Sequence, residues 1–238
     1  MKKIIISIFI IIFLSSCVQR KHSCAAYNQV QVCQDEVNHW TTIIYRMKKI
    51  LFILFIFPIL TFGQVRDSIY IKSSIFDIVY SEKLQQPKWI EYHVKCNDGT
   101  ISRKGLDFYT CDSIITSDGK DYENNVYDKG HLAPAADFNC DKKSLLTTFS
   151  YLNCVLQHEK LNRGTWRLLE SYERELSKKQ SVSVEIRMLY SKKSIVLPTG
   201  ATVPDAFIKT IRYGNKEEIY YFKNEIPSSS DFTKYRRK

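Results

Sequence analysis

Several features are missing from this sequence, and each absence removes a class of protein. No internal repeat and no low-complexity tract follows residue 64, so this part is neither a solenoid nor a low-complexity disordered chain. No C-x-x-C pair occurs, so the cysteines lack the spacing typical of a structural zinc site. No apolar run reaches the roughly 20 residues needed to span a bilayer as a helix. The remaining composition, 44% hydrophobic and 25% charged, is that of an ordinary globular protein.

The length and the charge fit one moderately basic domain. The chain has 238 residues, and domains commonly run about 100 to 200. Of the net charge of +10, half lies in residues 1–63, which hold seven Lys/Arg and two Asp/Glu. Residues 64–238 hold the other 28 basic and 23 acidic residues. This mild excess suits a protein that handles a polyanion, but many proteins without a nucleic-acid role share it.

The N-terminus resembles the leader of a bacterial lipoprotein. The first 17 residues, "MKKIIISIFIIIFLSSC", have a basic start, an apolar run over Ile4–Leu14 and then Leu-Ser-Ser-Cys. The last four letters resemble a lipobox, in which Cys17 is lipidated after cleavage. Cys17 is therefore a candidate membrane lipid anchor.

A second complete secretory signal follows the first. "MKKILFILFIFPILTFGQ" begins at Met47, and Gly63 fits as the last residue before cleavage. We interpret Met47 as the true start, with residues 1–46 derived from an upstream reading frame, 47–63 as the signal peptide and 64–238 as a single domain. The alternative is a lipid-anchored protein that retains an anchor near residue 55. In both cases the domain is exported by a bacterium and is periplasmic, secreted or lipid-anchored.

Export makes disulfide bonds plausible for the cysteines of the domain. Two disulfides among four cysteines allow three pairings. Nearness in sequence favours Cys96 with Cys111 and Cys140 with Cys154.

The order of expected elements is typical of an α+β fold rather than a regular βαβ array. Strands are expected first, then helices, then strands again. A hairpin turn is expected at "NDGT", 97–100, and a loosely attached tail from Ile226. The expected strands are 68–83 (a strand with its turn), 87–96, 149–156 (strand or extended), 181–190, 194–198, 205–214 and 218–224, and the expected helices are 141–149 and 159–178.

The longer helix carries polar groups on the same stripe as a tryptophan. Asn162, Trp166, Glu170 and Arg174 follow one another at intervals of four. A surface helix normally places its polar groups opposite its tryptophan. The simpler interpretation is an exposed Glu170–Arg174 pair that contributes about 0.3 to 0.5 kcal/mol.

A single histidine stands in "YDKGHLAPAADF", residues 127–138. Gly130 before it and a proline three residues after it mark a bend, where His131 can simply be solvated. A histidine there can also be a general base, with its tautomer fixed by Asp128 or by a backbone carbonyl. The motif alone leaves both interpretations open.

The two motifs together resemble the DNA/RNA non-specific endonuclease family of ββα-metal (His-Me finger) nucleases. The family pattern is D-R-G-H, then N-x-x-P-Q, then N-x-x-x-W-x-x-L-E. "DKGH" at 128–131 and "YLNCVLQHEKLNRGTWRLLE" at 151–170 match it in order and in local spacing. The resemblance implies a mixed or antiparallel sheet with a ββα-metal catalytic core.

The resemblance also implies roles for individual residues. His131 would be the general base and Asn162 the direct ligand of Mg²⁺, with Mn²⁺ as a second metal that fits. Glu170 would hold a metal-bound water, and Asn153 would orient His131 or the metal waters. Asp128 and Gln157 would support the site.

Three basic residues complete the implied site. Arg174 and Arg103 would bind the scissile phosphate. Lys129 stands where the family has arginine, which keeps a charge but loses the bidentate fork. A second departure, Leu156 in place of the family proline, concerns the stiffness of the loop.

The implied activity is hydrolysis of DNA and RNA phosphodiesters with little sequence preference, leaving 5′-phosphate ends. A hard cation stabilises the developing charge, a neutral histidine activates water near pH 7, and contacts to phosphate carry no sequence information. The alternative is a nucleic-acid-binding protein with the same fold, catalytically weakened by Lys129. A third hypothesis, a structural surface lipoprotein, depends on Cys17 alone.

Overall fold

The computed structural model describes residues 65–96 and 98–237. Both signal-like segments, Cys17 and the expected boundaries at residues 46 and 63 lie outside the described residues. Within the described part, no helix is both long enough and apolar enough to cross a membrane.

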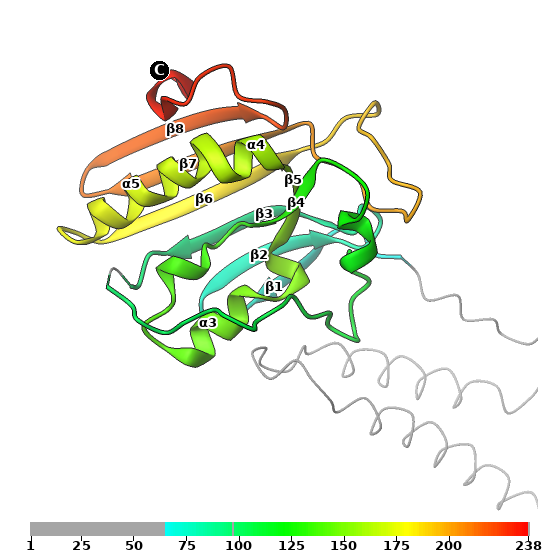
Figure 1. Cartoon of the computed structure of the whole chain (residues 1–238), viewed down its shortest axis with the longest axis horizontal. Coiled ribbons are helices and arrows are strands. Elements are labelled where there is room, and N and C mark those ends of the chain that lie inside the picture. Colours follow the sequence, from blue (N-terminus) through cyan, green and yellow to red (C-terminus); the bar gives the residue numbers. More distant parts are fainter. Residues whose placement is uncertain (1–64, 97, 238) are drawn as a thin grey trace, which may run out of the picture.

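A seven-stranded antiparallel sheet forms the body of the molecule (Figure 1). Its strand order is β1-β2-β3-β6-β7-β8-β9, and every neighbouring pair is antiparallel. The expected α+β class with antiparallel pairing is confirmed. The strands are β1 (Ile69–Lys72), β2 (Phe76–Ser81), β3 (Gln86–His93), β6 (Val182–Leu189), β7 (Ala206–Tyr213), β8 (Lys216–Lys223) and β9 (Arg236–Arg237).

Alternation along the strands divides this sheet into a core face and an outer face. On β6, Val184 and Ile186 are fully buried, whereas Glu185 between them forms ion pairs with Arg187 and Arg212. An antiparallel sheet can expose one face to water because its strands need no crossover helices on both sides. The apolar face is therefore the one that the rest of the chain covers.

A second unit of two strands and a helical segment covers that face. The hairpin consists of β4 (Tyr127–His131) and β5 (Cys154–His158), which pair antiparallel. The helical segment runs directly on from β5 and lies over the sheet along the direction of β6, β7 and β8 (Figure 1). Its parts are α4 (Glu159–Leu161), a π turn η4 (Asn162–Trp166) and α5 (Arg167–Ser177).

Tryptophan packing joins the helical segment to the sheet. Trp166 is fully buried, and its ring lies 5.4 Å from that of Phe207 and 5.6 Å from that of Phe222. Burial of an aromatic side chain of this size contributes about 1.5 to 3 kcal/mol. The contact fixes which side of the helical segment faces the core.

Five short helical elements complete the described structure. Asp141 accepts a hydrogen bond from the Ser144 backbone, which confirms the expected helix start there. The elements are η1 (Gly119–Tyr122), η2 (Ala135–Asp137), α3 (Lys142–Thr148), η3 (Tyr151–Asn153) and η5 (Phe232–Tyr235).

Three expected elements are wrong. No hairpin follows the stretch at 98–100, because β3 pairs with β6 and the next strand, β4, belongs to the other sheet. Residues 194–198 form no strand and make only a bridge from Val196 to Thr202. The tail is not loosely attached: β9 pairs with β8, and Tyr235 stacks on Phe222 at 4.7 Å.

The expected disulfide pairing is also wrong. Cys96 is bonded to Cys140 rather than to Cys111, and Cys154 is a free, buried thiol. The fold brings the end of β3 beside the turn before α3, across 44 residues of sequence. Sequence nearness failed because it takes no account of which segments meet in space.

Candidate active site

The β4-β5 hairpin places the histidine motif next to the start of the helical segment. In the hairpin, Asp128 lies opposite Gln157 and His131 lies opposite Cys154. Because β5 runs straight into α4, the first helical residues return toward β4. Two strands and a helix therefore enclose one site.

Asp128 holds Asn162 in a defined orientation. The Asn162 amide nitrogen donates to Asp128 Oδ2 at 2.9 Å, and Arg163 Nε donates to the same oxygen at 2.8 Å. Burial opposes ionisation of Asp128, but these hydrogen bonds outweigh it and lower its pKa. Because the nitrogen of the Asn162 amide is used by Asp128, its carbonyl oxygen is the atom left to face a cation.

A π turn separates the direction of Asn162 from that of Trp166. The expected single helix over 159–178 is interrupted: the π turn at Asn162–Trp166 joins two helices across a kink, where Gly164 leaves helical geometry (φ −103°, ψ −112°). A wider turn breaks the i, i+4 stripe expected from the sequence. Asn162 therefore contacts β4, whereas Trp166 packs on the large sheet.

His131 lies at the end of β4 between two phenyl rings. Its ring centroid is 4.6 Å from that of Phe108 and 4.9 Å from that of Phe149. Its Nε2 atom is buried and has no hydrogen-bond partner among the described residues. Burial, with the positive charge of Arg103 as a second cause, lowers the pKa of His131 to about 3, so the imidazole is neutral at pH 7.

The environment of His131 corrects one expectation. Asp128 does not fix the histidine tautomer, because its carboxylate binds Asn162 and Arg163.

Lys129 shares the face of β4 that carries His131. Its Nζ atom donates to Asp107 Oδ1 at 3.0 Å and lies 5.7 Å from the centre of the Tyr151 ring. Arg103 is exposed in the segment between β3 and β4, close enough to His131 to perturb its pKa. These residues place two cations near the histidine.

Asn153 binds the backbone that follows His131. The buried amide accepts from Ala133 N at 2.8 Å and donates to Ala133 O and Thr148 O, each at 2.9 Å. Its hydrogen bonds fix the path of the backbone two residues beyond the histidine. Asn153 therefore positions the backbone next to His131.

Gln157, on β5 opposite Asp128, is fully buried. Neither polar atom of its amide has a partner among the described residues. A Cβ at Gly130 would lie 2.7 Å from Gln157 Oε1 and 2.8 Å from its Cβ. The glycine of the motif is therefore required by the close approach of Gln157, and the two residues set the spacing within the hairpin.

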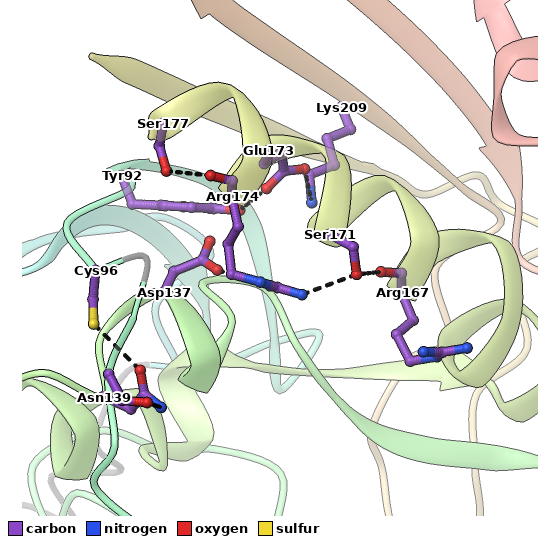
Figure 2. A network of polar contacts seen from close by, with 11 residues as sticks. Tyr92, Cys96, Asp137, Asn139, Arg167, Ser171, Glu173, Arg174, Ser177 and Lys209 are labelled. Atoms are coloured by element: carbon purple, nitrogen blue, oxygen red, sulfur yellow. Dashed lines mark hydrogen bonds and ion pairs between the residues drawn. The ribbon is translucent and has the colours of Figure 1, made fainter. Parts of the chain in front are cut away.

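Glu170 and Arg174 lie one turn apart on α5. Glu170 is half-buried, and burial raises its pKa to about 7, against the influence of Lys209 and Arg174. Arg174 donates to Asp137 Oδ1 at 2.9 Å and to Ser171 Oγ at 3.0 Å (Figure 2). The Glu170–Arg174 pair is therefore not a simple surface pair, because the guanidinium is held by a buried carboxylate.

A buried ion pair anchors α5 to the sheet. Lys209 Nζ on β7 is 2.6 Å from Glu173 Oε1, and neither side chain is exposed. Tyr92 on β3 donates to the other oxygen of Glu173 at 3.0 Å (Figure 2). Lys209 also lies 4.5 Å from the centre of the Trp166 ring. This network positions the helix that carries Glu170 and Arg174.

Several contributing residues were not found from the sequence. Asp107, Phe108, Asp137, Glu173 and Lys209 contact the site residues only through the tertiary fold. One of them had a usable signal, because Lys209 is a charged residue at a core-facing position between Phe207 and Ile211 on β7.

The available ligand atoms fit a hard cation rather than zinc. Asn162 and Glu170 offer amide and carboxylate oxygens, which Mg²⁺ and Mn²⁺ prefer. Over residues 65–96 and 98–237, no group of three or more His, Cys, Asp or Glu side chains could hold a metal. The orientation of Asn162 by Asp128 is the specific feature that suits a site with few protein ligands.

Comparison with known proteins finds sequence similarity to several nucleases. The mitochondrial nuclease EXOG of Danio rerio is 32% identical over 107 residues, 43% of this chain and 31% of the relative. A nuclease of Serratia marcescens is 28% identical over 169 residues, 62% of each chain. The chain thus matches from about a third to less than two thirds of the length of these curated relatives.

A solved structure and a family model complete the comparison. A chain from the crystal structure of an EndoG/EndoGI complex has the same fold, with a TM-score of 0.64, 24% identity, and coverage of 71% of this chain and 80% of that one. The sequence model described as DNA/RNA non-specific endonuclease matches residues 59–238. The chain therefore belongs to the DNA/RNA non-specific endonuclease family.

Proposed function

We propose that the protein is an endonuclease that hydrolyses phosphodiester bonds of DNA and RNA with little sequence preference and leaves 5′-phosphate ends. One observation carries the proposal: Asp128 in the β4 motif holds the Asn162 amide, so the cation-ligand candidate and His131 belong to one ββα unit. Family membership supports the same substrate class.

His131 is the residue that takes a proton from the attacking water. It is neutral at pH 7, as a general base must be. Its ring is held by Phe108 and Phe149, and the following backbone is fixed by Asn153. The Nε2 atom is buried, so water must gain access to it before the reaction.

Cationic side chains stabilise the charge that develops on the phosphate. Arg174 is the best ordered of them, since Asp137 and Ser171 hold its guanidinium nitrogens. Lys129 and Arg103 supply charge on the side of His131. Positive groups fixed in advance stabilise the transition state more than groups that must be ordered during the reaction.

Asn162 and Glu170 are the residues that would hold Mg²⁺ or Mn²⁺, Asn162 directly and Glu170 through water. When bound, such a cation polarises the phosphate and stabilises the leaving oxygen. The chain's own contribution is to aim the Asn162 oxygen through the hydrogen bond to Asp128.

Digestion of plasmid DNA and of RNA by the purified protein tests the proposal. We expect cleavage with Mg²⁺ and its loss with a chelator, and we expect His131→Ala and Asn162→Ala each to lower the rate at least about 100-fold. A matched control is His93→Ala, which changes an exposed histidine at the end of β3. Equal rates for the wild type and His131→Ala would exclude a role of His131 as the base.

A catalytically weakened nucleic-acid-binding protein is the second candidate, and one contact favours it. Lys129 is engaged by Asp107 and lacks the fork geometry of arginine. This candidate predicts salt-sensitive binding without turnover, and restored cleavage in Lys129→Arg.

We also propose export, on the basis of the two signal-like segments within residues 1–63. Protein made in a bacterial host should then be found outside the cytoplasm as a shortened chain. An intact mass that begins at Gln64 supports cleavage after Gly63, whereas a mass that includes lipid on Cys17 supports the anchored form. Cys17→Ser should release the anchored form from membranes.

A further inference from the structure

Asp107 forms an ion pair with the ammonium group that Lys129 would offer to a phosphate. Its Oδ1 atom lies 3.0 Å from Lys129 Nζ, and the hydrogen bond from Lys129 is the main cause of its lowered pKa. The side chain of Asp107 is 79% exposed, whereas that of Lys129 is 29% exposed. A carboxylate and a phosphate both offer anionic acceptor oxygens to an ammonium group, so the two compete for it.

The neighbouring residue, Phe108, covers the histidine. Its ring lies 4.6 Å from the ring of His131, whose Nε2 atom is buried. One stretch of two residues therefore both pairs with Lys129 and packs against His131. Because Asp107 and Phe108 are adjacent in sequence, a movement of the backbone at Asp107 also moves the Phe108 ring that contacts His131.

This stretch belongs to neither sheet. Between Asp98 and Asp118 the chain forms no helix and no strand apart from the bridge at Tyr109. Tyr109 is fixed by backbone hydrogen bonds with Phe149 and Tyr151. Asp107 lies just outside this anchor and is held to β4 by an exposed ion pair, which is a weak type of contact.

We propose that Asp107 competes with substrate phosphate for Lys129 and thereby determines the affinity of the site for nucleic acid and the access of water to His131. The inference rests on the proposed function, in which Lys129 faces phosphate. Binding of the backbone releases Asp107, and Phe108 then leaves the face of His131. An exposed ion pair of this kind shifts such an equilibrium by up to about fivefold.

Two isosteric variants separate the competition from a general effect of charge. Asp107→Asn and Asp98→Asn each remove one negative charge from the same segment, but only Asp107 pairs with Lys129. Binding of a fluorescein-labelled DNA duplex is measured by anisotropy in EDTA at fixed ionic strength, so that no cleavage occurs. We expect Asp107→Asn to bind about three to five times more tightly than Asp98→Asn. Equal affinities of the two variants would overturn the proposal.

The Lys129→Ala background tests whether the effect passes through Lys129. There, Asp107→Asn should bind DNA no more tightly than Asp98→Asn. A persistent difference would show that Asp107 repels nucleic acid directly instead of competing for Lys129, which contradicts the proposal.

Chemical modification tests the cover over His131. Diethyl pyrocarbonate reacts with accessible imidazole nitrogens, and its product on His131 can be followed by peptide mass spectrometry. We expect faster modification of His131 in Asp107→Asn than in Asp98→Asn, with His93 as the internal reference. An unchanged rate of His131 modification would refute the part of the proposal in which release of Asp107 makes His131 more accessible. Cleavage of plasmid DNA is measured separately, so a protein that shows the affinity difference without cleavage refutes the proposed enzyme and leaves the competition intact.

Discussion

At the scale of single residues, the site depends on groups whose protonation is set by burial. His131 loses the hydration of its charged form between Phe108 and Phe149, and its pKa falls accordingly. Glu170 is shifted in the opposite direction, because burial also disfavours a carboxylate. Both groups are thus biased toward their neutral forms before substrate and cation bind.

The depressed pKa of His131 predicts a loss of stability in acid. Between the ordinary histidine pKa of 6.5 and about 3, the unfolded chain binds a proton that the folded chain does not. The free energy of unfolding should therefore fall as the pH drops through this window, by at most about 1.4 kcal/mol per pH unit from this residue. Urea unfolding of wild type and His131→Gln at about pH 6.5 and about pH 4 measures it. The stability difference between the two proteins should change with pH, and parallel curves would contradict the prediction.

The contact between Asp137 and Arg174 predicts a coupling in catalysis. Asp137→Asn weakens the hydrogen bond that orients the guanidinium, and a hydrogen bond to a charged group contributes about 1.5 to 3 kcal/mol. We expect kcat/KM for DNA to fall by about 10- to 100-fold. In an Arg174→Ala background, Asp137→Asn should cause little further loss, because its effect passes through the guanidinium. Losses that simply add would assign Asp137 to folding instead.

At the scale of elements, the π turn at Asn162–Trp166 decides where the metal-ligand candidate points. The turn joins α4 to α5 across a kink at Gly164, so it displaces Asn162 relative to Trp166. Trp166 is locked against Phe207 and Phe222. A π turn inside a helix is frequent at functional sites, and here it lets one segment satisfy both the core and the site.

Deletion of Gly164 should convert the π turn to a regular α-helical turn. With Trp166 fixed in the core, Asn162 would rotate by about 100° and lose Asp128, since an α-helix has 3.6 residues per turn. We expect cleavage to fall at least about 100-fold, with little loss of helix content by circular dichroism. Gly164→Ala is the matched control, because a Cβ there meets no atom within 4 Å. Full activity of the deletion variant would disprove the importance of the turn.

Elements could be predicted from the sequence where one face of a strand or helix is buried. The strands expected at 181–190, 205–214 and 218–224 correspond to β6, β7 and β8, each displaced by two residues or fewer at its ends. The alternation of apolar residues in these strands indicates which face of the sheet is buried. The prediction of a hairpin at 97–100 is wrong, because a turn signal does not specify which strand pairs with which.

At the scale of the whole molecule, buried charges join the helical segment to the sheet. Glu173 and Lys209 are separated by 36 positions in sequence and meet in the core at 2.6 Å, where Tyr92 gives Glu173 a second partner. Such a pair stabilises little relative to apolar residues, but removal of one partner leaves an uncompensated charge. The pair therefore fixes the position of α5 more than it adds stability.

Lys209→Met should destabilise the protein by about 3 to 5 kcal/mol, because Glu173 would be left buried without its cation. The double variant Lys209→Met, Glu173→Gln should recover much of that stability, since the buried charge is then absent. Urea unfolding curves of the three proteins measure both effects. A double variant less stable than Lys209→Met alone would show that the ion pair itself stabilises the core.

The sequence by itself determined the class of fold, the positions of β3, β6, β7 and β8 along the chain, and the set of residues that match the family motifs. These depend on local spacing: alternation in strands, and the order of Asp128, His131, Asn162 and Glu170 along the chain. Only the tertiary structure decided the Cys96–Cys140 pairing, the use of Asp128 to orient Asn162, and the contact between Lys129 and Asp107. Each of these joins segments whose meeting is set by packing against the common sheet, and short-range sequence patterns do not encode which distant segments come together.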